Sequence, residues 1–206
     1  MIGKLFIVSA PSGAGKTSLV NAVIQKLNPH YTIERALTYT TRQPRHNEIP
    51  GIDYHFISST EFEYKIMQGF FIEWSTAYGV YYGSSKIILE TLETGQSVII
   101  IVDRQGAKSI VREIHEAILV WIAPSSPIVL AQRLNNRSTE TPEQIMFRLA
   151  VGQKELQNEV ETKFFTHHII NDDFHDALAD LELIICTELS GNPEIFHGKK
   201  SFKRKF

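Results

Sequence analysis

The sequence predicts an α/β fold, in which a parallel sheet core is flanked by helices, and three observations support this prediction. Short runs rich in Ile and Val, apolar throughout, are spaced along the chain. Helical patterns of apolar residues lie between them, and a Gly-rich turn joins the first run to the first helical pattern. Because connections between parallel strands are right-handed crossovers, this alternation favours a parallel sheet with helices on both faces.

Each expected strand is short and has no polar side, as is typical of strands buried inside a parallel sheet. Gly95 suits the left-handed end of one expected helix, and Thr60 followed by Glu63 resembles a capping box at the start of another. The expected strands are residues 5–9, 98–102, 118–122 and 168–170, and the expected helices are residues 17–27, 61–68, 85–94 and a C-terminal helix that carries Phe174, Leu178, Leu181 and Ile185.

Two stretches break the alternation and are expected to be insertions in the core. Residues 38–83, rich in Tyr, Phe and turn residues, are expected to form a small mixed α+β insertion. Residues 133–148 are polar with spaced arginines, which suits a mobile lid that excludes water from a phosphotransferase. The core is then residues 1–37 and 84–190. The basic tail, residues 191–206, is interpreted as a solvated terminus or as a segment facing phosphate or another subunit.

Composition limits the partners that we expect for this chain. Its 21 Lys and Arg residues and 23 Asp and Glu residues give a formal charge of −2, so no nucleic-acid or membrane partner is expected. No apolar run approaches the ~20 residues that span a bilayer. Cys186 is the only cysteine, which excludes an intrachain disulfide, suits a reducing compartment and favours a cytoplasmic location. The sequence leaves both a monomer and a homo-oligomer open.

Residues 10–17 have the spacing of a Walker A phosphate loop between a strand and a helix. Glycines let consecutive backbone N–H groups converge on phosphate oxygens, and the helix N-terminus adds its positive dipole end. Lys16 supplies a charge to the β- and γ-phosphates, and the Thr17 hydroxyl can ligate Mg²⁺. The predicted loop for a nucleoside triphosphate comprises Ala10, which replaces the usual first Gly, Pro11, Ser12, Gly13, Ala14, Gly15, Lys16 and Thr17.

Two further features point to an acceptor site. Arg42 and Arg45 flank a proline, a pattern that is equally typical of a solvated loop. Glu73 lies inside the apolar run 70–74, where a carboxylate is rare unless it is paired. This carboxylate, and the Tyr-rich segment 78–84 that follows it, favour a site over a solvated loop.

Together with the phosphate loop, these features resemble the guanylate kinases over nearly the whole chain, to about Leu189. The resemblance implies a P-loop nucleoside monophosphate kinase fold and a magnesium-assisted transfer of a phosphoryl group from ATP to GMP in purine nucleotide metabolism. Residues 38–83 would then bind GMP. The resemblance implies that Arg42, Arg45, Tyr54 and Tyr82 hold the phosphate of GMP, and that Thr38, Glu73 and Ser84 contact guanine.

The chemistry of these side chains agrees with the roles that the resemblance implies. A phosphate dianion suits guanidinium groups and phenol donors. Guanine presents adjacent N1–H and N2–H₂ donors, which a carboxylate such as Glu73 accepts, and the Thr38 hydroxyl can donate to O6. Adenine lacks the paired donors and would leave Glu73 buried and unpaired.

The segment 101–106 resembles the family pattern Asp-x-Asp-x-Gln-Gly, except that Ile101 replaces the first acidic residue. Asp103 matches the second acidic residue and is predicted to contact GMP, with a helix N-cap before Gln105 as the alternative. Because the side chain of Ile101 has no carboxylate oxygen, we expect Thr17, the substrate phosphates and water to hold Mg²⁺.

The resemblance also implies contacts to ATP from the lid. Arg133, Arg137 and Arg148 match the arginines that gather over the ATP phosphates, although Asn136 and Ser138 replace the glycines usual beside the middle arginine. Asn171 is predicted to contact the adenine, with a helix cap as the alternative. The predicted catalytic residues are Lys16, Arg42, Arg137 and Arg148.

This set needs no nucleophilic side chain, because the attacking atom is a GMP phosphate oxygen that is largely deprotonated at neutral pH. Two alternatives stay open at this point. A non-catalytic guanylate-kinase-like module that binds protein partners is supported only by Ile101. A small-molecule kinase with a different acceptor is opposed by Glu73 and Thr38.

Overall fold

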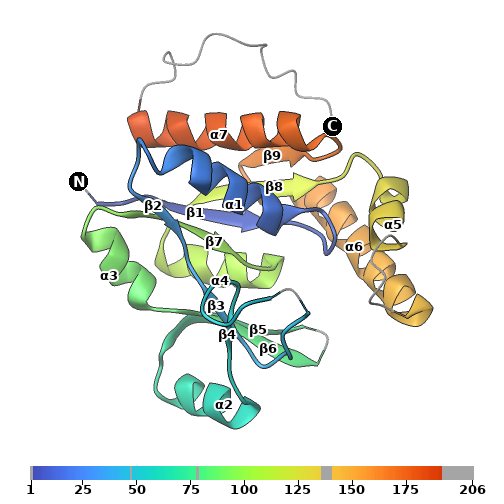
Figure 1. Cartoon of the computed structure of the whole chain (residues 1–206), viewed down its shortest axis with the longest axis horizontal. Helices are drawn as coiled ribbons and strands as arrows, with labels where there is room; N and C mark the ends of the chain where they lie inside the picture. Colours follow the sequence, from blue (N-terminus) through green and yellow to red (C-terminus); the bar gives the residue numbers. More distant parts are fainter. Residues whose placement is uncertain (1, 47, 78, 136–140, 192–206) are drawn as a thin grey trace. The chain divides into compact units, whose positions relative to one another are not determined.

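The computed structural model describes residues 2–46, 48–77, 79–135 and 141–191 (Figure 1). The predicted site residue Arg137 and the basic tail from residue 192 onward lie outside these residues. The chain divides into two compact units. Unit 1 comprises Met1–Ile7 and His30–Ile118, and unit 2 comprises Val8–Pro29 and Leu119–Phe206.

Five strands form the larger sheet in the order β2-β7-β1-β8-β9. In unit 1, β2 (Ile33–Arg35) pairs in parallel with β7 (Ser97–Ile101), and in unit 2, β8 (Ile118–Ala123) pairs in parallel with β9 (His167–Ile170). The strand β1 (Leu5–Ser9) is buried along its whole length, as its apolar sequence predicts. The α/β class predicted from the sequence is therefore confirmed, whereas the short strand β2 was not predicted.

Unit 1 also contains a second sheet, in the order β4-β3-β6-β5. Its strands are β3 (Thr38–Thr40), β4 (His55–Phe56), β5 (Phe71–Ala77) and β6 (Val80–Ser85). The helix α2 (Ser59–Met67) packs against this sheet through Phe62, whose ring stacks on Phe71 and on Tyr81. The predicted insertion 38–83 thus contains almost all of a sheet with its own aromatic core.

Two predicted helix starts in unit 1 are wrong. The side chain of Ser58, not Thr60, caps α2 by accepting a hydrogen bond from the Glu61 N–H, because the helix begins two residues earlier than the Thr60 capping box requires. Ser85 belongs to β6, and the helix α3 begins only after it, at Ile87 (Ile87–Glu93). The end of this helix follows the prediction, because Gly95 adopts a left-handed φ of 89°.

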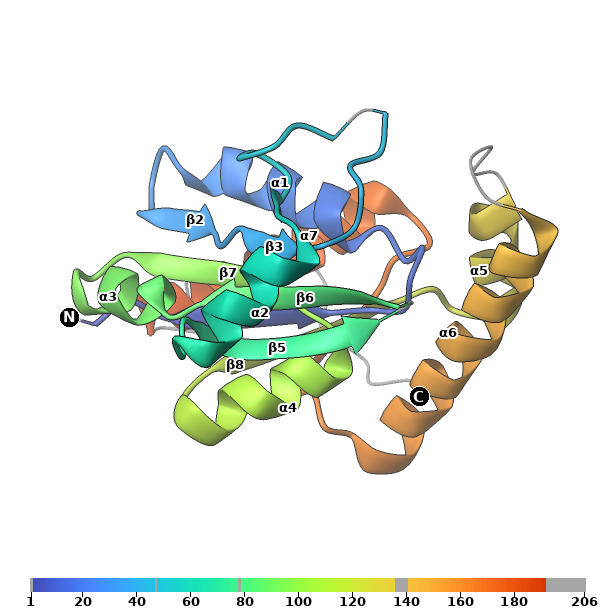
Figure 2. The same ribbon diagram turned by 90° about the horizontal axis from the view of Figure 1, so that it is seen from below.

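Unit 2 carries four of the described helices, α1 (Lys16–Leu27), α5 (Pro127–Asn135), α6 (Pro142–Thr162) and α7 (Phe174–Ser190). In Figures 1 and 2, α1 lies beside α7, and α5 lies beside α6. A capping box of Thr141 and Gln144 starts α6, so the described parts of the predicted lid 133–148 are helical.

None of the described helices combines the length and the apolar character that crossing a bilayer demands.

Candidate active site

Three of the predicted guanine-contacting residues form one row across the second sheet. Thr38 of β3 lies directly opposite Ser84 of β6, and Ser84 lies opposite Glu73 of β5. Residues that face each other on neighbouring strands share one face of the sheet. All three side chains are buried. The structure therefore brings two hydroxyl groups and a carboxylate together, as the site prediction requires.

A β-bulge turns Glu73 toward this row. The pairing register of β5 shifts between Phe71 and Glu73, so that Phe71 opposes Ser85 while Glu73 opposes Ser84. In a regular strand, residues two apart point to the same face, whereas an extra residue reverses this relation. Phe71 accordingly stacks on Phe62 of α2, while the carboxylate of Glu73 approaches Gly106 of α4 (Arg104–Glu113).

The Glu73 carboxylate is held in a dry environment. Glu73 is only 5% exposed, and its Oε1 accepts a 2.6 Å hydrogen bond from the Ser84 hydroxyl. Burial raises the pKa of Glu73 to about 7, with the negative charge of Asp103 adding to the rise and the Ser84 hydrogen bond opposing it. A buried carboxylate of this kind offers strong acceptor oxygens to a ligand that brings its own donors.

Asp103 is the N-cap of α4, as the alternative interpretation of this residue states. Its Oδ1 accepts a 2.7 Å hydrogen bond from the Gly106 N–H, and its Oδ2 accepts a 2.8 Å hydrogen bond from the Ser75 hydroxyl. Ser75 lies on β5, two residues after Glu73. The Asp103 carboxylate therefore fastens the start of α4 to the strand that carries Glu73.

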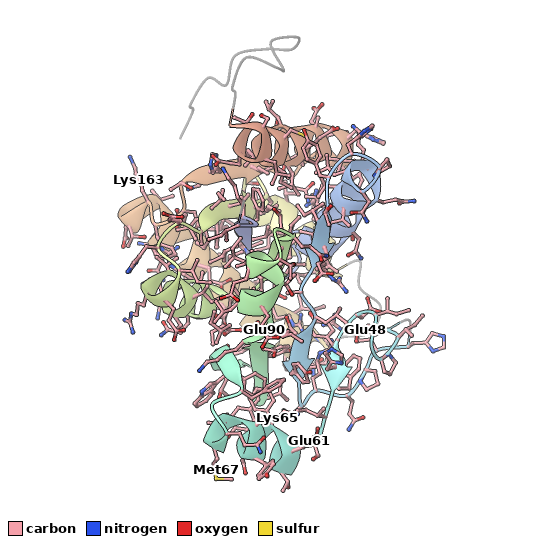
Figure 3. The ribbon with its side chains drawn as sticks, turned by 90° about the vertical axis from the view of Figure 1, so that its left-hand side faces the viewer. Glu48, Glu61, Lys65, Met67, Glu90 and Lys163 are labelled. Atoms are coloured by element: carbon pink, nitrogen blue, oxygen red, sulfur yellow. The ribbon has the colours of Figure 1, made fainter. Side chains whose placement is uncertain are left out.

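The two arginines predicted to hold the GMP phosphate share one carboxylate, that of Glu48, a residue labelled in Figure 3. Arg42 makes a bidentate pair with it, at 2.7 Å from Nη1 to Oε2 and 2.8 Å from Nη2 to Oε1. Arg45 donates its backbone N–H to Oε2 at 2.8 Å, and its guanidinium lies 3.5 Å from Oε1. Burial raises the pKa of Glu48, but the hydrogen bonds from Arg42 and Arg45 outweigh it and leave the pKa lowered.

Sequence analysis assigned no role to Glu48, although its spacing from Arg42 and Arg45 was a usable signal. Glu48 lies three positions after Arg45 and six after Arg42. Its carboxylate can reach both arginines only if the loop folds back on itself. The Tyr54 ring lies 5.2 Å from the Arg42 guanidinium carbon and 6.4 Å from the Tyr82 ring. All four predicted phosphate-holding residues are thus in one cluster, arranged around Glu48.

In unit 2, the phosphate loop owes its shape to two glycines. Gly13 and Gly15 have φ values of 97° and 84°, which side-chain-bearing residues rarely adopt. The Ala14 N–H donates to the Pro11 carbonyl at 3.1 Å, and Lys16 Nζ donates to the Ala10 carbonyl at 3.2 Å. Since Gly15 is the N-cap of α1 and has no side chain, the first N–H groups of this helix can serve an anion.

Two distant side chains are fastened to this loop. Arg148 of α6 donates to the Ser12 hydroxyl at 2.9 Å, and the Asn171 amide donates to the Ala14 carbonyl at 2.7 Å. Asn171 is only 3% exposed. The alternative of Asn171 as a helix cap is wrong, because Asp173 caps α7 by accepting from the N–H groups of His175 and Asp176. Asp173 is better placed because it directly precedes the first helical residue.

Arg133 of α5 is held by the segment that follows β9. Its Nη2 donates to the Asp172 carbonyl at 3.1 Å, and the Asp172 carboxylate accepts a 2.9 Å hydrogen bond from the Ser125 N–H. Hydrogen bonding from Ser125, first from its side chain and then from this backbone N–H, lowers the pKa of Asp172 against the opposing effect of burial. Of the predicted lid arginines, Arg133 and Arg148 thus have defined partners, and Arg137 falls in the undescribed stretch 136–140.

Comparison with known proteins agrees with the fold and identifies the family of this chain. A family model described as guanylate kinase matches residues 2–188. The guanylate kinase of Idiomarina loihiensis is 40% identical over 195 residues, which cover 94% of this chain and 90% of that protein. The guanylate kinase of Shewanella violacea is 43% identical over 184 residues, covering 89% of this chain and 86% of that protein.

A solved structure extends the agreement to the backbone. The crystal structure of guanylate kinase from Anaplasma phagocytophilum, at 23% identity, matches with a TM-score of 0.71 over 91% of this chain and 86% of that chain. This likeness supports the fold, while the family model and the curated relatives carry the identification. The chain belongs to the guanylate kinase family.

Proposed function

We propose that this protein transfers the γ-phosphoryl group of ATP to GMP, giving ADP and GDP. The observation that carries the proposal is the row of Thr38, Ser84 and Glu73, in which a buried carboxylate lies in line with two hydroxyl groups. We place the reaction in cytoplasmic purine nucleotide metabolism, since a lone buried cysteine suits a reducing compartment.

Guanine is the base that suits this row. Its N1–H and N2–H₂ donors would pair with the two carboxylate oxygens of Glu73, and its O6 would accept from the Thr38 hydroxyl. Adenine brings no such pair of donors, so the buried carboxylate of Glu73 would keep only the hydrogen bond from Ser84. Asp103, which raises the pKa of Glu73 by its charge, would gain from the same donors because they offset the repulsion between the two carboxylates.

The phosphate of GMP would bind at the cluster around Glu48. Arg42 and Arg45 bring two positive charges, of which Glu48 balances only one. The cluster therefore keeps a net positive charge for a phosphate dianion, and Tyr54 and Tyr82 add phenol donors. Since Arg42 is already oriented by its bidentate pair, less side-chain entropy is lost when the phosphate binds.

ATP would bind at the phosphate loop of unit 2, with Lys16 and the first N–H groups of α1 toward its β- and γ-phosphates. In the reaction, an oxygen of the GMP phosphate attacks the γ-phosphorus, a new P–O bond forms, and the bond between this phosphorus and the β–γ bridging oxygen breaks. ADP leaves with that oxygen. The catalytic contribution of Lys16, Arg42, Arg137 and Arg148 is to align the groups and neutralise their charge.

Mg²⁺ fits this chain as an ion brought by the nucleotide phosphates. Groups of three His, Cys, Asp or Glu side chains able to hold a metal are absent from the described part of the chain. The side chain of Ile101 contains no oxygen, and both carboxylate oxygens of Asp103 already accept hydrogen bonds. The Thr17 hydroxyl, in the first turn of α1, remains the protein ligand that we assign, with phosphate oxygens and water completing the set. When bound, Mg²⁺ supplies positive charge that neutralises the phosphates.

An assay of ADP release with ATP and Mg²⁺ against GMP, AMP, CMP and UMP tests the proposal. We expect turnover with GMP and little with the other three. Glu73→Gln should lower kcat/KM for GMP by about 100-fold, because an amide nitrogen replaces one acceptor oxygen. Folded protein that turns over none of the four monophosphates would overturn the proposal and favour the protein-binding module.

A further inference from the structure

The helix α4 approaches the Glu73 carboxylate through a glycine. Gly106 is buried in the first turn of α4, three residues after the N-cap. A Cβ atom at this position would lie 2.7 Å from Glu73 Oε2, 3.2 Å from Glu73 Cδ and 3.1 Å from Val102 Cβ. Carbon and carboxylate oxygen do not approach within 3.0 Å without displacement, so any side chain at position 106 requires the carboxylate to move.

The carboxylate and the helix are both held where they meet. The Ser84 hydroxyl binds Glu73 Oε1 from β6 at 2.6 Å, which leaves Oε2 on the side of Gly106. On the helix side, Asp103 accepts from the Gly106 N–H and from the Ser75 hydroxyl of β5. The separation between the α4 backbone and Glu73 Oε2 is therefore fixed from both directions.

Backbone conformation does not explain the glycine. Gly106 is helical and is not among the glycines with positive φ. Within a helix, glycine is less favourable than alanine, so a glycine here lowers the helix propensity of α4 without a conformational reason. The close approach to Glu73 is the remaining physical reason for this residue.

We propose that Gly106 is a positioning residue for guanine recognition: the absence of a side chain lets α4 form a wall behind Glu73 Oε2, which aims the carboxylate at the donors of the base. The proposal rests on the proposed function and adds a residue that determines acceptor specificity. The expected effect of adding a side chain at position 106 follows from this contact. Because the displaced atom is the end of a side chain, Gly106→Ala should fold normally and yet bind GMP poorly.

The kinetic test compares Gly106→Ala with Gly152→Ala. Gly152 of α6 is a matched control, since a Cβ there would also meet a side-chain atom at 2.7 Å, in this case Leu130 Cδ2. We expect Gly106→Ala to raise KM for GMP about 10- to 100-fold, with KM for ATP within about twofold of the original value. We expect Gly152→Ala to leave KM for GMP unchanged. Equal KM values for GMP in Gly106→Ala and the original protein would overturn the proposal.

A double-mutant cycle separates positioning from general damage to α4. Glu73→Asp shortens the side chain by one methylene and withdraws the carboxylate from position 106. The effect of Gly106→Ala on KM for GMP should therefore fall to about twofold or less in the Glu73→Asp background. Additive effects would mean that the alanine acts on something other than the carboxylate, and would overturn the proposal.

A spectroscopic measurement tests the contact between position 106 and Glu73 independently of the kinase reaction. The side-chain carboxyl carbon of Glu73 can be followed by carbon-13 NMR in the ligand-free protein, where Gly106→Ala should shift its resonance and Gly152→Ala should not. If the original protein failed to phosphorylate GMP, the proposed function would fall. An unshifted Glu73 resonance in Gly106→Ala would overturn the present inference whatever the kinase assay gives.

Discussion

We propose that two regions recognise their ligands by different means: the acceptor region of unit 1, which is the row of Thr38, Ser84 and Glu73 with the cluster around Glu48, and the phosphate loop of unit 2. Around Glu73, selectivity depends on side chains, because a buried carboxylate meets only a base with the matching donors. In the loop, binding depends on the backbone, because Gly13 and Gly15 permit a shape in which N–H groups converge. Side-chain changes in the first region should therefore alter which nucleotide binds, and changes near the loop should alter triphosphate binding or the rate for every acceptor.

The largest expected effect belongs to the loop. Lys16→Ala removes the cation that would neutralise the transferring phosphoryl group, so kcat should fall by about 1000-fold with every accepted monophosphate. The affinity for GMP, measured by calorimetry without ATP, should stay within about twofold. A large loss of GMP affinity would show that the two regions are not separable in this way.

The second prediction concerns stability, because burying the ionised Glu73 carboxylate lowers the free energy of unfolding. In the folded protein the pKa of Glu73 is raised from 4.5 to about 7, so between these pH values the folded state binds more protons than the unfolded state. The free energy of unfolding therefore falls as pH rises from 4.5 through 7, in total by on the order of 3 kcal/mol. Glu73→Gln carries no charge, so it should be more stable than the original protein at pH 8 and similar to it near pH 4.5.

Urea unfolding of the ligand-free protein at pH 5 and pH 8 measures this difference. Glu90→Gln, at an exposed position on α3 labelled in Figure 3, is the control and should leave the pH dependence unchanged. If Glu73→Gln and the original protein lost stability equally between these pH values, burial of the charge would carry no cost. The selectivity of the acceptor region would then need another origin.

The two regions also differ in how far the sequence predicts them. The phosphate loop is a contiguous motif, and the preceding strand is buried over all five residues because four of them are apolar and only the last, Ser9, is polar. The acceptor site depends on pairings between residues far apart in the chain. The bulge before Glu73, and the close approach of Gly106 to the Glu73 carboxylate, arise only when β5, β6 and α4 have assembled. No local sequence pattern therefore predicts them.

Local ambiguity explains the wrong helix starts. Ser58, Ser59 and Thr60 all have hydroxyl groups able to cap α2, and only the place where the backbone leaves its extended conformation decides among them. Ser85 stands where β6 pairs with Phe71, and this long-range pairing outweighs the helical pattern that follows. Glu48 was missed for a related reason, since its role depends on the fold of a loop.

The third prediction tests preorganisation of the phosphate cluster. Glu48→Gln keeps the volume of the side chain but breaks the bidentate pair with Arg42, so the guanidinium must be ordered by GMP itself. We expect KM for GMP to rise about 10-fold, because the ordering cost outweighs the relief of repulsion between Glu48 and the phosphate. Guanosine, which lacks the phosphate, should bind equally well to both proteins. A lower KM for GMP would identify Glu48 as an occupant that the phosphate displaces.

The smallest effect is expected from replacing Asn171. This residue combines features of both regions, because its buried side chain supports the backbone of the phosphate loop. Asn171→Ala removes the 2.7 Å hydrogen bond to the Ala14 carbonyl, so KM for ATP should rise about fivefold while KM for GMP stays within about twofold. Inhibition by tripolyphosphate, which has no base, distinguishes two roles of Asn171. Support of the loop predicts that the variant weakens tripolyphosphate and ATP alike, whereas a contact to adenine predicts that only ATP is weakened.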